Sequence, residues 1–470
     1  MSSRFGRREF LKKSVGVAAL AAGASAVGTP AILAERSPNS KLNTAVIGAN
    51  GRGMAHVPVA ASEHLVAMVD IDDRRMASTL DWLDKNSPGV RSKVKTYYDY
   101  RKMFDQMHKQ VDAVFIAIPD HSHACATMMA IKLGKHVYCE KPLTHDIYEA
   151  RALGQAARQY KVMTQMGNQG HASESIRVLR EYLEAGAIGT VLETHTWTSQ
   201  YYGDKVRRPD EPAPNGVHWD EWIGPGPWCH YRSDLHPNAW YYWKDYGTGL
   251  LPCVGVHAFD AVHWGLQLKY PTSVEVLGQE DGGPGVWPTF STLLYEFPRA
   301  GLPPLKAYWY GGKRREQIAK DHDDQLFGAK NLNHPRVADE LTAKYKRDLT
   351  SCGTIFVGEK GYIYCEEYCG GARIVPEEKH RQYTPPPKKY ARTRGIHADF
   401  LRAVKEGGDP PSSNFPDVSG PYLEALLVGN LAMLAGLGKK VEWDGVNMRC
   451  TNLPELNQHV RREYRKGWSL

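Results

Sequence analysis

The segment Gly48-Ala49-Asn50-Gly51-Arg52-Gly53 can bring backbone N–H groups close to a phosphate. Glycine has no Cβ, so such a turn can approach a pyrophosphate, and the N-terminus of a following helix adds a favourable field. Asn50 stands where the dinucleotide fingerprint usually has its second Gly, which makes this segment a weak signal by itself. An ordinary Gly-rich turn is the alternative.

An acidic residue, Asp70, follows 22 residues after Gly48. At the end of the second strand of such a unit, a carboxylate can accept hydrogen bonds from ribose hydroxyls. It would repel a 2′-phosphate, which favours NAD over NADP, although Arg74 and Arg75 lie nearby. Taken alone, Asp70 could also be a helix cap.

A lysine in Glu140-Lys141-Pro142 directly follows the apolar run 136–139. Beside a nicotinamide, Lys141 could hydrogen-bond a substrate hydroxyl. If burial and the adjacent cofactor charge lower its pKa, it could also share its proton as hydride departs. A surface salt bridge with Glu140 is the alternative.

These motifs lie among short apolar, β-branched runs that alternate with helical stretches. The runs cover 44–47, 65–69, 95–98, 113–118, 136–139 and 162–166. Apolar runs buried on both faces and separated by crossover helices predict a parallel doubly wound sheet, the Rossmann pattern.

Five polar segments each follow a different predicted strand. They are the Gly-rich segment, Asp70, Pro119-Asp120, Glu140-Lys141 and Gly167-Asn168. Carboxyl ends of parallel strands meet at one edge of the sheet, where such folds bind ligands, so this convergence predicts a bound dinucleotide.

Longer strands with Gly and Pro turns follow residue 190. They are expected at 191–197, 273–278, 291–297, 306–311 and 354–367, and they predict a second, mostly antiparallel sheet. The predicted domains are a signal at 1–34, a linker at 35–42, an NAD-binding domain at 43–166 and an α/β domain at 167–470. The connection 198–246 is long and rich in aromatic residues, and such loops are usually functional.

The N-terminus carries a twin-arginine pattern, Arg7-Arg8-Glu9-Phe10-Leu11-Lys12, followed by a small-residue apolar run at 15–34. It predicts export by the twin-arginine machinery to the periplasm or another extracytoplasmic site, with the signal cleaved or kept as a membrane tether. A functional spanning helix is disfavoured by the Ala and Gly content and by Pro30. This route carries folded proteins, which predicts a cofactor loaded before export.

The composition is that of a soluble globular protein, with 470 residues, 42% hydrophobic and 24% charged. The formal charge is +7, and much of the excess lies in the first 34 residues, so no nucleic-acid partner is indicated. The eight Cys form no paired CxxC signature. Cys365 and Cys369 could pair, but two buried thiols are favoured.

Aromatic side chains give the clue to the substrate. Seven of the 12 Trp lie between residues 197 and 264. Flat rings stack on the C–H faces of pyranoses while polar edges bind hydroxyls, so a carbohydrate substrate is predicted, with Trp240 and Tyr242 among its contacts. The alternative, that aromatics pack the long loop onto the sheet, explains at least half of them.

The Gly48–Gly53 segment with Asp70, the Ile118-Pro119-Asp120-His121-Ser122-His123 segment and Glu140-Lys141-Pro142 resemble the Gfo/Idh/MocA family, named for glucose-fructose oxidoreductase and inositol dehydrogenase. The resemblance continues to Tyr464-Arg465-Lys466-Gly467-Trp468 and so covers nearly the whole chain after the signal. The arrangement is similar to the exported, twin-arginine branch of that family.

The resemblance implies a Rossmann domain, then an α/β domain whose large, mostly antiparallel sheet often mediates homo-oligomer contacts. A sugar or polyol would lie between that sheet and the nicotinamide. The catalytic residues would be Lys141 and His257, with substrate contacts from Lys141, Asn168, Trp240, Tyr242, His257 and Asp260. The expected cofactor-binding residues are Gly48, Asn50, Gly51, Arg52, Gly53, Asp70, Pro119, Asp120, His123, Glu140, Lys141 and Asn168.

One position departs from the family pattern. The usual aspartate four residues before His257 is replaced by Cys253, and a thiol cannot replace a carboxylate in orienting a base at neutral pH. Either His257 acts without that partner, Asp260 or Asp245 substitutes, or the chemistry is not simple alcohol oxidation. A metal site on His257, Asp260 and His263 is conceivable, but no motif fixes a fourth ligand and no metal is predicted.

Three functions follow from these observations. The first is an NAD-dependent oxidoreductase in which hydride passes between a tightly held nicotinamide and a sugar hydroxyl. The second is an NAD-dependent glycosidase or lyase that oxidises the sugar ring only transiently. The third is a non-catalytic sugar-binding protein that has kept the dinucleotide fold.

Overall fold

The computed structural model describes residues 40–198, 200, 207–314, 333–346, 348–349 and 352–470. The chain divides into residues 1–36 and 37–470, and all described residues belong to the second unit. The predicted twin-arginine signal at 1–34 lies outside the described residues.

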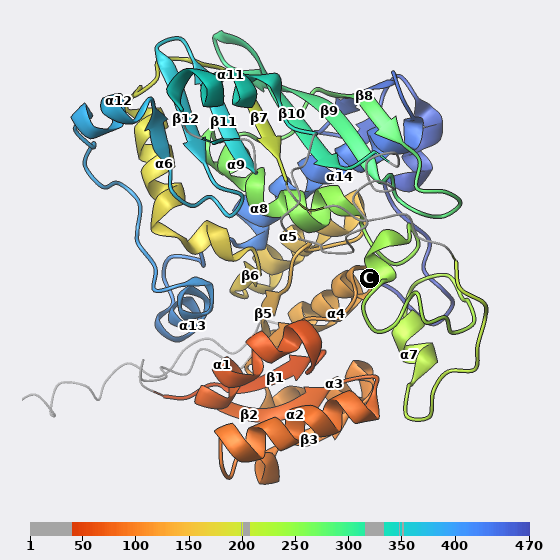
Figure 1. Cartoon of the computed structure of the whole chain (residues 1–470). Helices are drawn as coiled ribbons and strands as arrows, with labels where there is room; N and C mark the ends of the chain where they lie inside the picture. Colours follow the sequence, from red (N-terminus) through yellow and green to blue (C-terminus); the bar gives the residue numbers. More distant parts are fainter. Residues whose placement is uncertain (1–39, 199, 201–206, 315–332, 347, 350–351) are drawn as a thin grey trace, which may run out of the picture. The chain divides into compact units, whose positions relative to one another are not determined.

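The first sheet has six parallel strands in the order β3-β2-β1-β4-β5-β6 (Figure 1). The strand order reverses between β1 and β4, which is the switch point of a doubly wound sheet and confirms the predicted Rossmann pattern. The strands are β1 (Asn43–Ile47), β2 (His64–Val69), β3 (Lys95–Tyr97), β4 (Ala113–Ile116), β5 (His136–Cys139) and β6 (Thr164–Met166).

Side-chain caps begin three of the helices that flank this sheet. Asp72, Asp99 and Asp146 each accept a backbone N–H of the first turn, and Glu149 completes a capping box with Asp146. The helices are α1 (Val57–Ser62), α2 (Asp73–Asn86), α3 (Tyr100–Met107), α4 (Asp120–Lys132) and α5 (Ile147–Tyr160).

The second sheet has nine strands in the order β13-β12-β11-β7-β10-β9-β8-β14-β15. Among the described strands of this sheet only β7 and β10 pair in parallel, so the predicted mostly antiparallel sheet is confirmed. The strands are β7 (Val191–Trp197), β8 (Ser273–Glu280), β9 (Phe290–Arg299), β10 (Leu302–Gly312), β11 (Gly353–Gly358), β12 (Gly361–Cys365), β13 (Arg373–Val375), β14 (Lys440–Asp444) and β15 (Arg449–Cys450).

The single strand predicted at 354–367 is wrong. The structure has a hairpin in which β11 and β12 pair antiparallel, with Gly358 opposite Gly361. Glu359 and Lys360 form the turn, and the φ of +155° at Gly361 explains why a glycine follows them.

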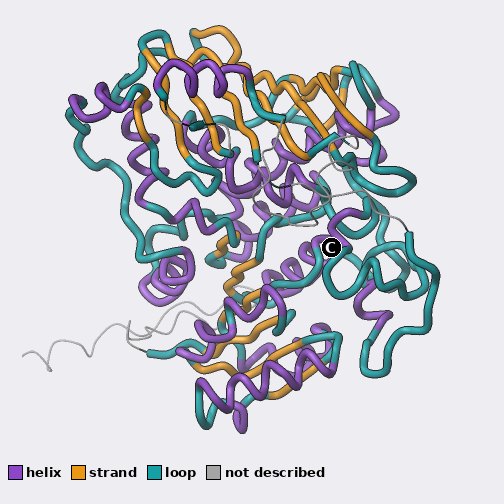
Figure 2. Tube along the Cα trace, in the orientation of Figure 1, coloured by secondary structure: helices purple, strands orange, loops and turns teal. Residues whose placement is uncertain are grey.

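Helix α14 lies between the two halves of the fold. It is buried along nearly its whole length and packs against α5 on one side and against β8 and β9 on the other (Figures 1 and 2). The segment Phe415–Ala435 is long and apolar enough to cross a membrane, but most of it is buried in the core. The other helices here are α6 (Glu174–Glu184), α7 (Trp219–Ile223), α8 (Val256–Ala258), α9 (Asp260–Gly265), α11 (Arg336–Tyr345), α12 (Glu377–Gln382), α13 (Ile396–Glu406) and α14 (Gly420–Ala435), and a π-helical turn (Leu251–Gly255) precedes α8.

The described part of the long connection, residues 207–246, returns to the Rossmann sheet. Gly216 O accepts the N–H of Asp73 at 2.8 Å, and His218 N donates to Ile71 O at 2.8 Å. The His218 ring also stacks on Tyr98, with centroids 3.8 Å apart. The connection therefore packs against the ends of β2 and β3.

The C-terminal segment is anchored by a buried ion pair. Arg462 donates to Glu149 Oε1 from two nitrogens at 2.7 and 3.0 Å, and the Tyr464 hydroxyl donates to the same oxygen at 2.9 Å. The Glu149 side chain has no exposed area, so its charge depends on these donors.

Replacing Arg462 should therefore destabilise the fold. We expect Arg462→Met to lower the free energy of unfolding by about 3–5 kcal/mol, because it leaves the Glu149 charge buried without its cation. Denaturant unfolding of the purified protein measures this. Arg461→Met is the control, since exposed Arg461 contacts only the Tyr148 ring among the interactions described, at 4.2 Å. Equal stability of the two variants would contradict the ion pair's role.

Candidate functional site

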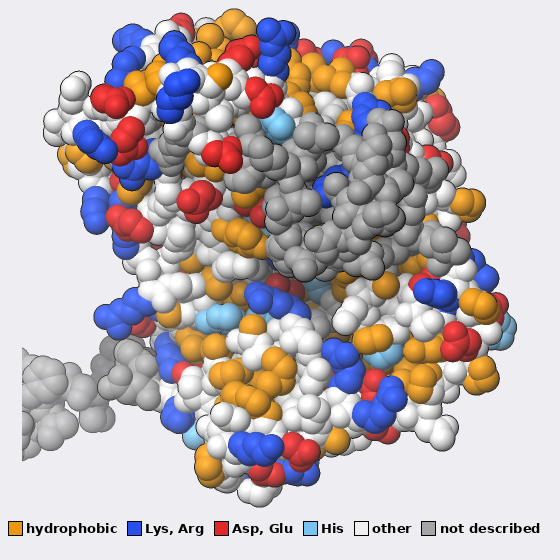
Figure 3. Space-filling model, in the orientation of Figure 1, with side chains coloured by type: hydrophobic (Ala, Val, Ile, Leu, Met, Phe, Trp, Pro, Cys, Tyr) orange, Lys and Arg blue, Asp and Glu red, His pale blue; other side chains and the backbone are white. Residues whose placement is uncertain are grey.

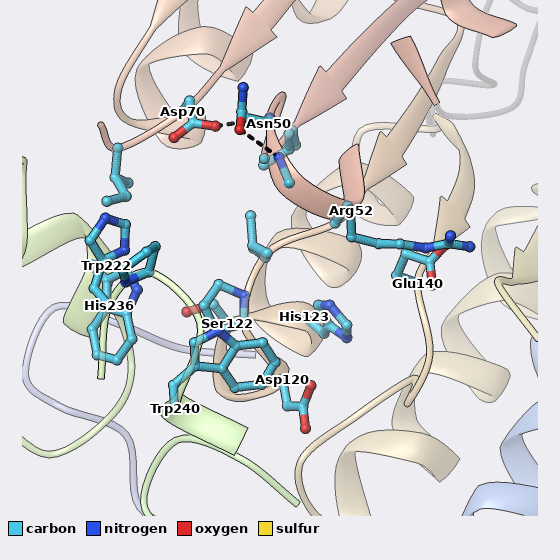
Figure 4. A pocket seen from close by; sticks show the side chains of 18 of the residues that line it. Asn50, Arg52, Asp70, Asp120, Ser122, His123, Glu140, Trp222, His236 and Trp240 are labelled. Carbon is cyan, nitrogen blue, oxygen red and sulfur yellow. Dashed lines mark hydrogen bonds and ion pairs between the residues drawn. The ribbon is translucent and has the colours of Figure 1, made fainter. Parts of the chain in front are cut away.

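A cavity of about 590 Å³ opens at the carboxyl ends of the Rossmann strands (Figure 4). Its wall combines residues of both halves of the chain. The first half contributes Gly48, Asn50, Gly51, Arg52, Asp70, Pro119, Asp120, His123, Glu140 and Lys141, and the second half contributes Glu221, Trp222, His236, Trp240, Tyr241, Cys253 and Trp468. The structure thus brings together most of the predicted cofactor-binding residues.

The glycines of the 48–53 segment allow a tight turn against β4. A Cβ at Gly48, where φ is +81°, would lie 2.2 Å from Ala117 O, and one at Gly53 would lie 1.7 Å from Gly48 O. Gly51, at φ +58°, borders the cavity. A bare backbone facing this space fits the close approach that a pyrophosphate needs.

Asn50 has a structural reason to replace the usual second glycine. Its Nδ2 donates to Arg75 O at 3.1 Å and to Thr79 Oγ1 at 3.0 Å. Its backbone N–H donates to Asp70 Oδ2 at 3.1 Å, as Figure 4 shows. Asn50 therefore fixes the turn to α2 and to the end of β2.

Asp70 faces the cavity from the end of β2. Its other oxygen, Oδ1, accepts the N–H of Asp72 at 3.1 Å. Burial raises the pKa of Asp70, against the lowering effect of these two backbone donors and of Arg75. Each carboxylate oxygen keeps lone pairs for a further donor.

Glu140 does not form the salt bridge with Lys141 that was the alternative for this motif. Its carboxylate lies 2.9 Å from Arg52 Nη2 (Figure 4). It also lies 3.1 Å from His56 Nε2. Burial by itself raises the pKa of Glu140, but His56 and Arg52 outweigh it and lower the pKa to about 2. A Cβ at Gly167 would lie 2.7 Å from this carboxylate, so a glycine is required there.

Lys141 contacts Cys253 across the cavity. Its Nζ donates to Cys253 O at 2.8 Å and lies 3.5 Å from Cys253 Sγ. Burial lowers the pKa of Lys141, but Cys253, Glu140 and Asp120 outweigh burial and the net pKa is raised. The lowered pKa expected from burial is therefore not found in the protein alone, because the acidic groups around the ammonium stabilise its charge.

Asp120 begins α4 and is only 1% exposed. Its Oδ2 accepts the N–H of Thr248 at 3.1 Å and the Thr248 hydroxyl at 2.8 Å. Its Oδ1 has no hydrogen-bond partner among the described residues. Burial raises the pKa of Asp120 to about 7.

His123 lies one helical turn further along α4 and is also buried. Its Nδ1 lies 2.7 Å from Pro142 O, which links α4 to the Glu140-Lys141-Pro142 segment. Burial lowers the pKa of His123, so its ring is neutral near pH 7.

His257 lies behind the cavity wall and not in it. The side chain is buried, and its ring centroid lies 4.4 Å from that of Tyr368. Burial and the charge of Lys141 keep the pKa of His257 well below its usual range. No carboxylate hydrogen-bonds this ring within the described part of the chain, since Asp260 has other partners and Asp245 is exposed.

Asn168 and Asp260, which were expected to touch substrate, bind each other in a buried network. Asn168 Nδ2 donates to Asp260 Oδ2 at 2.9 Å, and His171 Nδ1 lies 2.9 Å from the same oxygen. Asn168 Oδ1 accepts the Ser413 hydroxyl at 2.6 Å. Both side chains are buried in this network and neither lines the cavity.

The residues considered for a metal site do not converge. His263 Nε2 lies 2.9 Å from Lys269 O, away from the Asp260 network. Among the residues that the structure describes, no group of three His, Cys, Asp or Glu could hold a metal ion. Cys365 and Cys369 are both free and buried, so the disfavoured pairing between them is not formed.

The aromatic residues divide between the cavity and the core. Trp240 lines the cavity as predicted, but Tyr242 is buried with its hydroxyl 3.2 Å from that of Tyr241, which is the tyrosine at the wall. Trp219 and Trp243 donate their indole N–H groups to backbone carbonyls of the loop, and these two pack the loop, as the alternative proposed.

Two tryptophans at the wall were not predicted as site residues. Trp222 and Trp468 both line the cavity. A signal for each was present, since Trp222 lies in the aromatic-rich connection 198–246 and Trp468 lies in the C-terminal motif that carries the family resemblance. Neither segment showed from sequence alone that it folds over the Rossmann edge.

Comparisons with known proteins bear on this site. Residues 42–168 match the family described as "Oxidoreductase family, NAD-binding Rossmann fold" (GFO_IDH_MocA). The chain is 28% identical over 237 residues to "Rhizopine catabolism protein MocA" of Rhizobium meliloti, covering 50% of this chain and 61% of that protein. It is 29% identical over 114 residues to "Levoglucosan dehydrogenase" of Pseudarthrobacter phenanthrenivorans, covering 24% of this chain and 28% of that protein.

Solved structures share the fold over most of the chain. An inositol dehydrogenase homolog from Azotobacter vinelandii, complexed with NADH and myo-inositol, aligns with a TM-score of 0.55 at 17% identity, over 87% of this chain and 99% of the other. The WlbA dehydrogenase from Bordetella pertussis, in complex with NADH and UDP-GlcNAcA, gives 0.57 at 12% identity, over 86% and 99%. Over residues 42–168 the chain is therefore similar to the NAD-binding Rossmann domain of the Gfo/Idh/MocA family of oxidoreductases, and the glycine turn and Asp70 of this segment line the cavity.

Proposed function

We propose that the protein is an NAD-dependent oxidoreductase that transfers hydride between a tightly held nicotinamide and a hydroxyl-bearing carbon of a sugar or polyol. One observation carries the proposal: the Lys141 ammonium lies at the wall of the same cavity as the glycine turn and Asp70. Bound nicotinamide supplies the hydride acceptor or donor.

Residues at the Rossmann edge would hold the dinucleotide. Gly51 leaves space for the pyrophosphate, and the Asp70 carboxylate would accept hydrogen bonds from the adenosine ribose, which supports NAD over NADP. The pairing of Arg74 with Asp72 at 3.0 Å supports the same preference, since that guanidinium already has an anion.

Lys141 would bind the reacting hydroxyl. Its ammonium can exchange the hydrogen bond to Cys253 O for one to the substrate oxygen, because both lie at the cavity wall. In the reducing direction the ammonium donates a proton to that oxygen, and in the oxidising direction it must first lose one.

The aromatic part of the wall supports a carbohydrate. Trp222, Trp240 and Tyr241 offer flat faces that can stack on the C–H faces of a ring. Levoglucosan dehydrogenase has been solved in complex with NADH and L-sorbose, and the inositol dehydrogenase homolog with myo-inositol. A sugar or polyol is therefore the substrate class we propose.

Two further features support a cofactor that stays bound. Residues from the 207–246 connection and Trp468 line the cavity together with the Rossmann edge, so a dinucleotide there would be covered from several sides. The twin-arginine pattern supports export of the folded protein to a compartment without free NAD.

We also propose a homo-oligomer formed through the nine-stranded sheet. Charged side chains of both signs are interspersed on the described part of the face in Figure 3, which supports a small molecule over a nucleic acid as ligand.

The direct test is to identify what copurifies with the protein and what it does to sugars. We expect NAD or NADH in the denatured holoprotein, and transfer of deuterium from a C-deuterated sugar or polyol to it, with an oxidised product found by mass spectrometry. Release of a monosaccharide without net oxidation would instead support the glycosidase. Bound sugar without any exchange of deuterium would support a binding protein.

Lys141→Ala should leave the dinucleotide bound but lower turnover by about 10²- to 10⁴-fold, the usual contribution of one acid–base group. Single-turnover hydride transfer and NAD binding by fluorescence measure the two effects. Lys85→Ala, on the exposed face of α2, is the matched control. A near wild-type rate in the Lys141 variant would remove this residue from the mechanism.

Asp70→Ala should weaken the preference for NAD over NADP, because it removes the carboxylate that repels a 2′-phosphate. The measurement is the ratio of dissociation constants for the two cofactors, since loss of the Asn50 hydrogen bond also weakens binding of both. Asp105→Ala, exposed on α3, controls for a general effect of charge. An unchanged ratio would count against the ribose contact.

A further inference from the structure

The proposed reaction requires a proton to leave the Lys141 side chain before that side chain can accept one from a substrate hydroxyl. The raised pKa of Lys141 favours its charged form at neutral pH, so a nearby group that accepts the proton would assist this step. Three acidic groups act on the ammonium: Cys253, Glu140 and Asp120.

Glu140 is unsuited to this exchange. The pKa of about 2 that His56 and Arg52 give it makes it a poor proton acceptor, and its oxygens are engaged by these two side chains and by the Lys141 N–H at 3.2 Å. Its charge is fixed over the whole working range of pH and serves to hold Arg52.

Cys253 and His257 are also poor candidates. Cys253 presents a thiol, a weak hydrogen-bond acceptor, in the place where the family resemblance expects a carboxylate. His257 lies outside the cavity wall, and the Lys141 charge lowers its pKa further below the neutral range.

Asp120 lines the same cavity as Lys141, and its carboxyl interacts electrostatically with the ammonium. Thr248 fixes one of its oxygens by two hydrogen bonds, and Thr248 O in turn accepts from Asn430 Nδ2 at 2.8 Å on α14. The other oxygen is buried and has no hydrogen-bond partner among the described residues, a costly state for a charged carboxylate. Figure 4 shows Asp120 in the same region of the cavity as His123 and Trp240, away from Asp70 and Asn50.

The electrostatic surroundings agree with this geometry. Burial raises the pKa of Asp120 to about 7, with Lys141 and the Thr248 donors opposing the shift. The buried thiol of Cys139 also interacts electrostatically with the carboxyl, and burial keeps this thiol protonated near neutral pH. Asp120 can therefore both take up and release a proton near pH 7.

We propose that Asp120 is the proton-exchange partner of Lys141 and supplies the carboxylate that is missing at position 253. This inference rests on the proposed function. In the oxidising direction the Asp120 carboxylate takes a proton from the Lys141 ammonium, and the resulting amine takes the hydroxyl proton as the C–H hydride passes to the nicotinamide. The substrate becomes a carbonyl compound, and Asp120 releases one proton to solvent, so each turnover yields carbonyl, reduced cofactor and H⁺.

The first test compares Asp120→Asn with the wild-type holoprotein. We expect the wild-type rate of hydride transfer to increase with pH as Asp120 ionises, which gives the pH–rate profile a rising limb near pH 7. In Asp120→Asn this limb should be lost, with the rate at pH 7 lower by about 10²-fold or more and rising only where Lys141 itself loses a proton. NAD binding should be retained, and Asp105→Asn should keep both the rate and the limb.

A second substitution separates chemistry from folding. In the Asp120→Asn background, Cys253→Asp should raise the rate of hydride transfer at least tenfold, because it places a carboxylate beside Lys141 at position 253. Cys253→Ser should not raise this rate. If Asp120→Asn fails to fold, Thr248→Val retains the carboxyl but removes one donor to its charged form. The limb should then move to higher pH.

The outcomes distinguish this inference from the proposed function. If the wild type transfers hydride but its pH limb persists in Asp120→Asn, or does not move in Thr248→Val, then Asp120 is not the proton-exchange partner and the oxidoreductase assignment stands. If the wild-type holoprotein transfers no hydride to or from any sugar or polyol, the proposed function itself fails.

Discussion

The site depends on one buried carboxylate, Glu140, and on the two side chains, Arg52 and His56, that bind it. Arg52 comes from the glycine turn after β1 and His56 directly precedes α1, while Glu140 directly follows β5. An unpaired carboxylate at 3% exposure would be strongly unfavourable, so these three segments must stay together. The same cluster places Lys141, the next residue, where its ammonium reaches across the cavity.

Sequence reasoning could locate those parts of the site that are determined by a single strand end. The glycine turn, Asp70 and Lys141 each follow a buried strand directly, and parallel pairing alone brings such segments to one edge. The Rossmann sheet and the mostly antiparallel second sheet could be predicted for a similar reason, since alternation of apolar runs is a local property.

Residues whose partners come from distant segments could not be predicted in the same way. Asn168 and Asp260 bind each other, with His171 and Ser413 completing the network, and no local pattern shows that their polar atoms are already occupied. Tyr242 and Tyr241 are neighbours in sequence, so only the backbone direction decides which ring reaches the wall. The hairpin at 353–365 was read as one strand because β-branched and aromatic residues continue on both sides of its short turn.

The contact between Lys141 and position 253 has a consequence for variation among related chains. The ammonium is anchored by the main-chain oxygen of Cys253 at 2.8 Å, and the thiol is only a weaker neighbour at 3.5 Å. A peptide oxygen is supplied by any amino acid, so substitutions at this position need not release the lysine. Substitutions at position 253 would change the acidity beside Lys141 but leave the architecture of the site in place. Catalytic properties can therefore diverge at this position without loss of the fold.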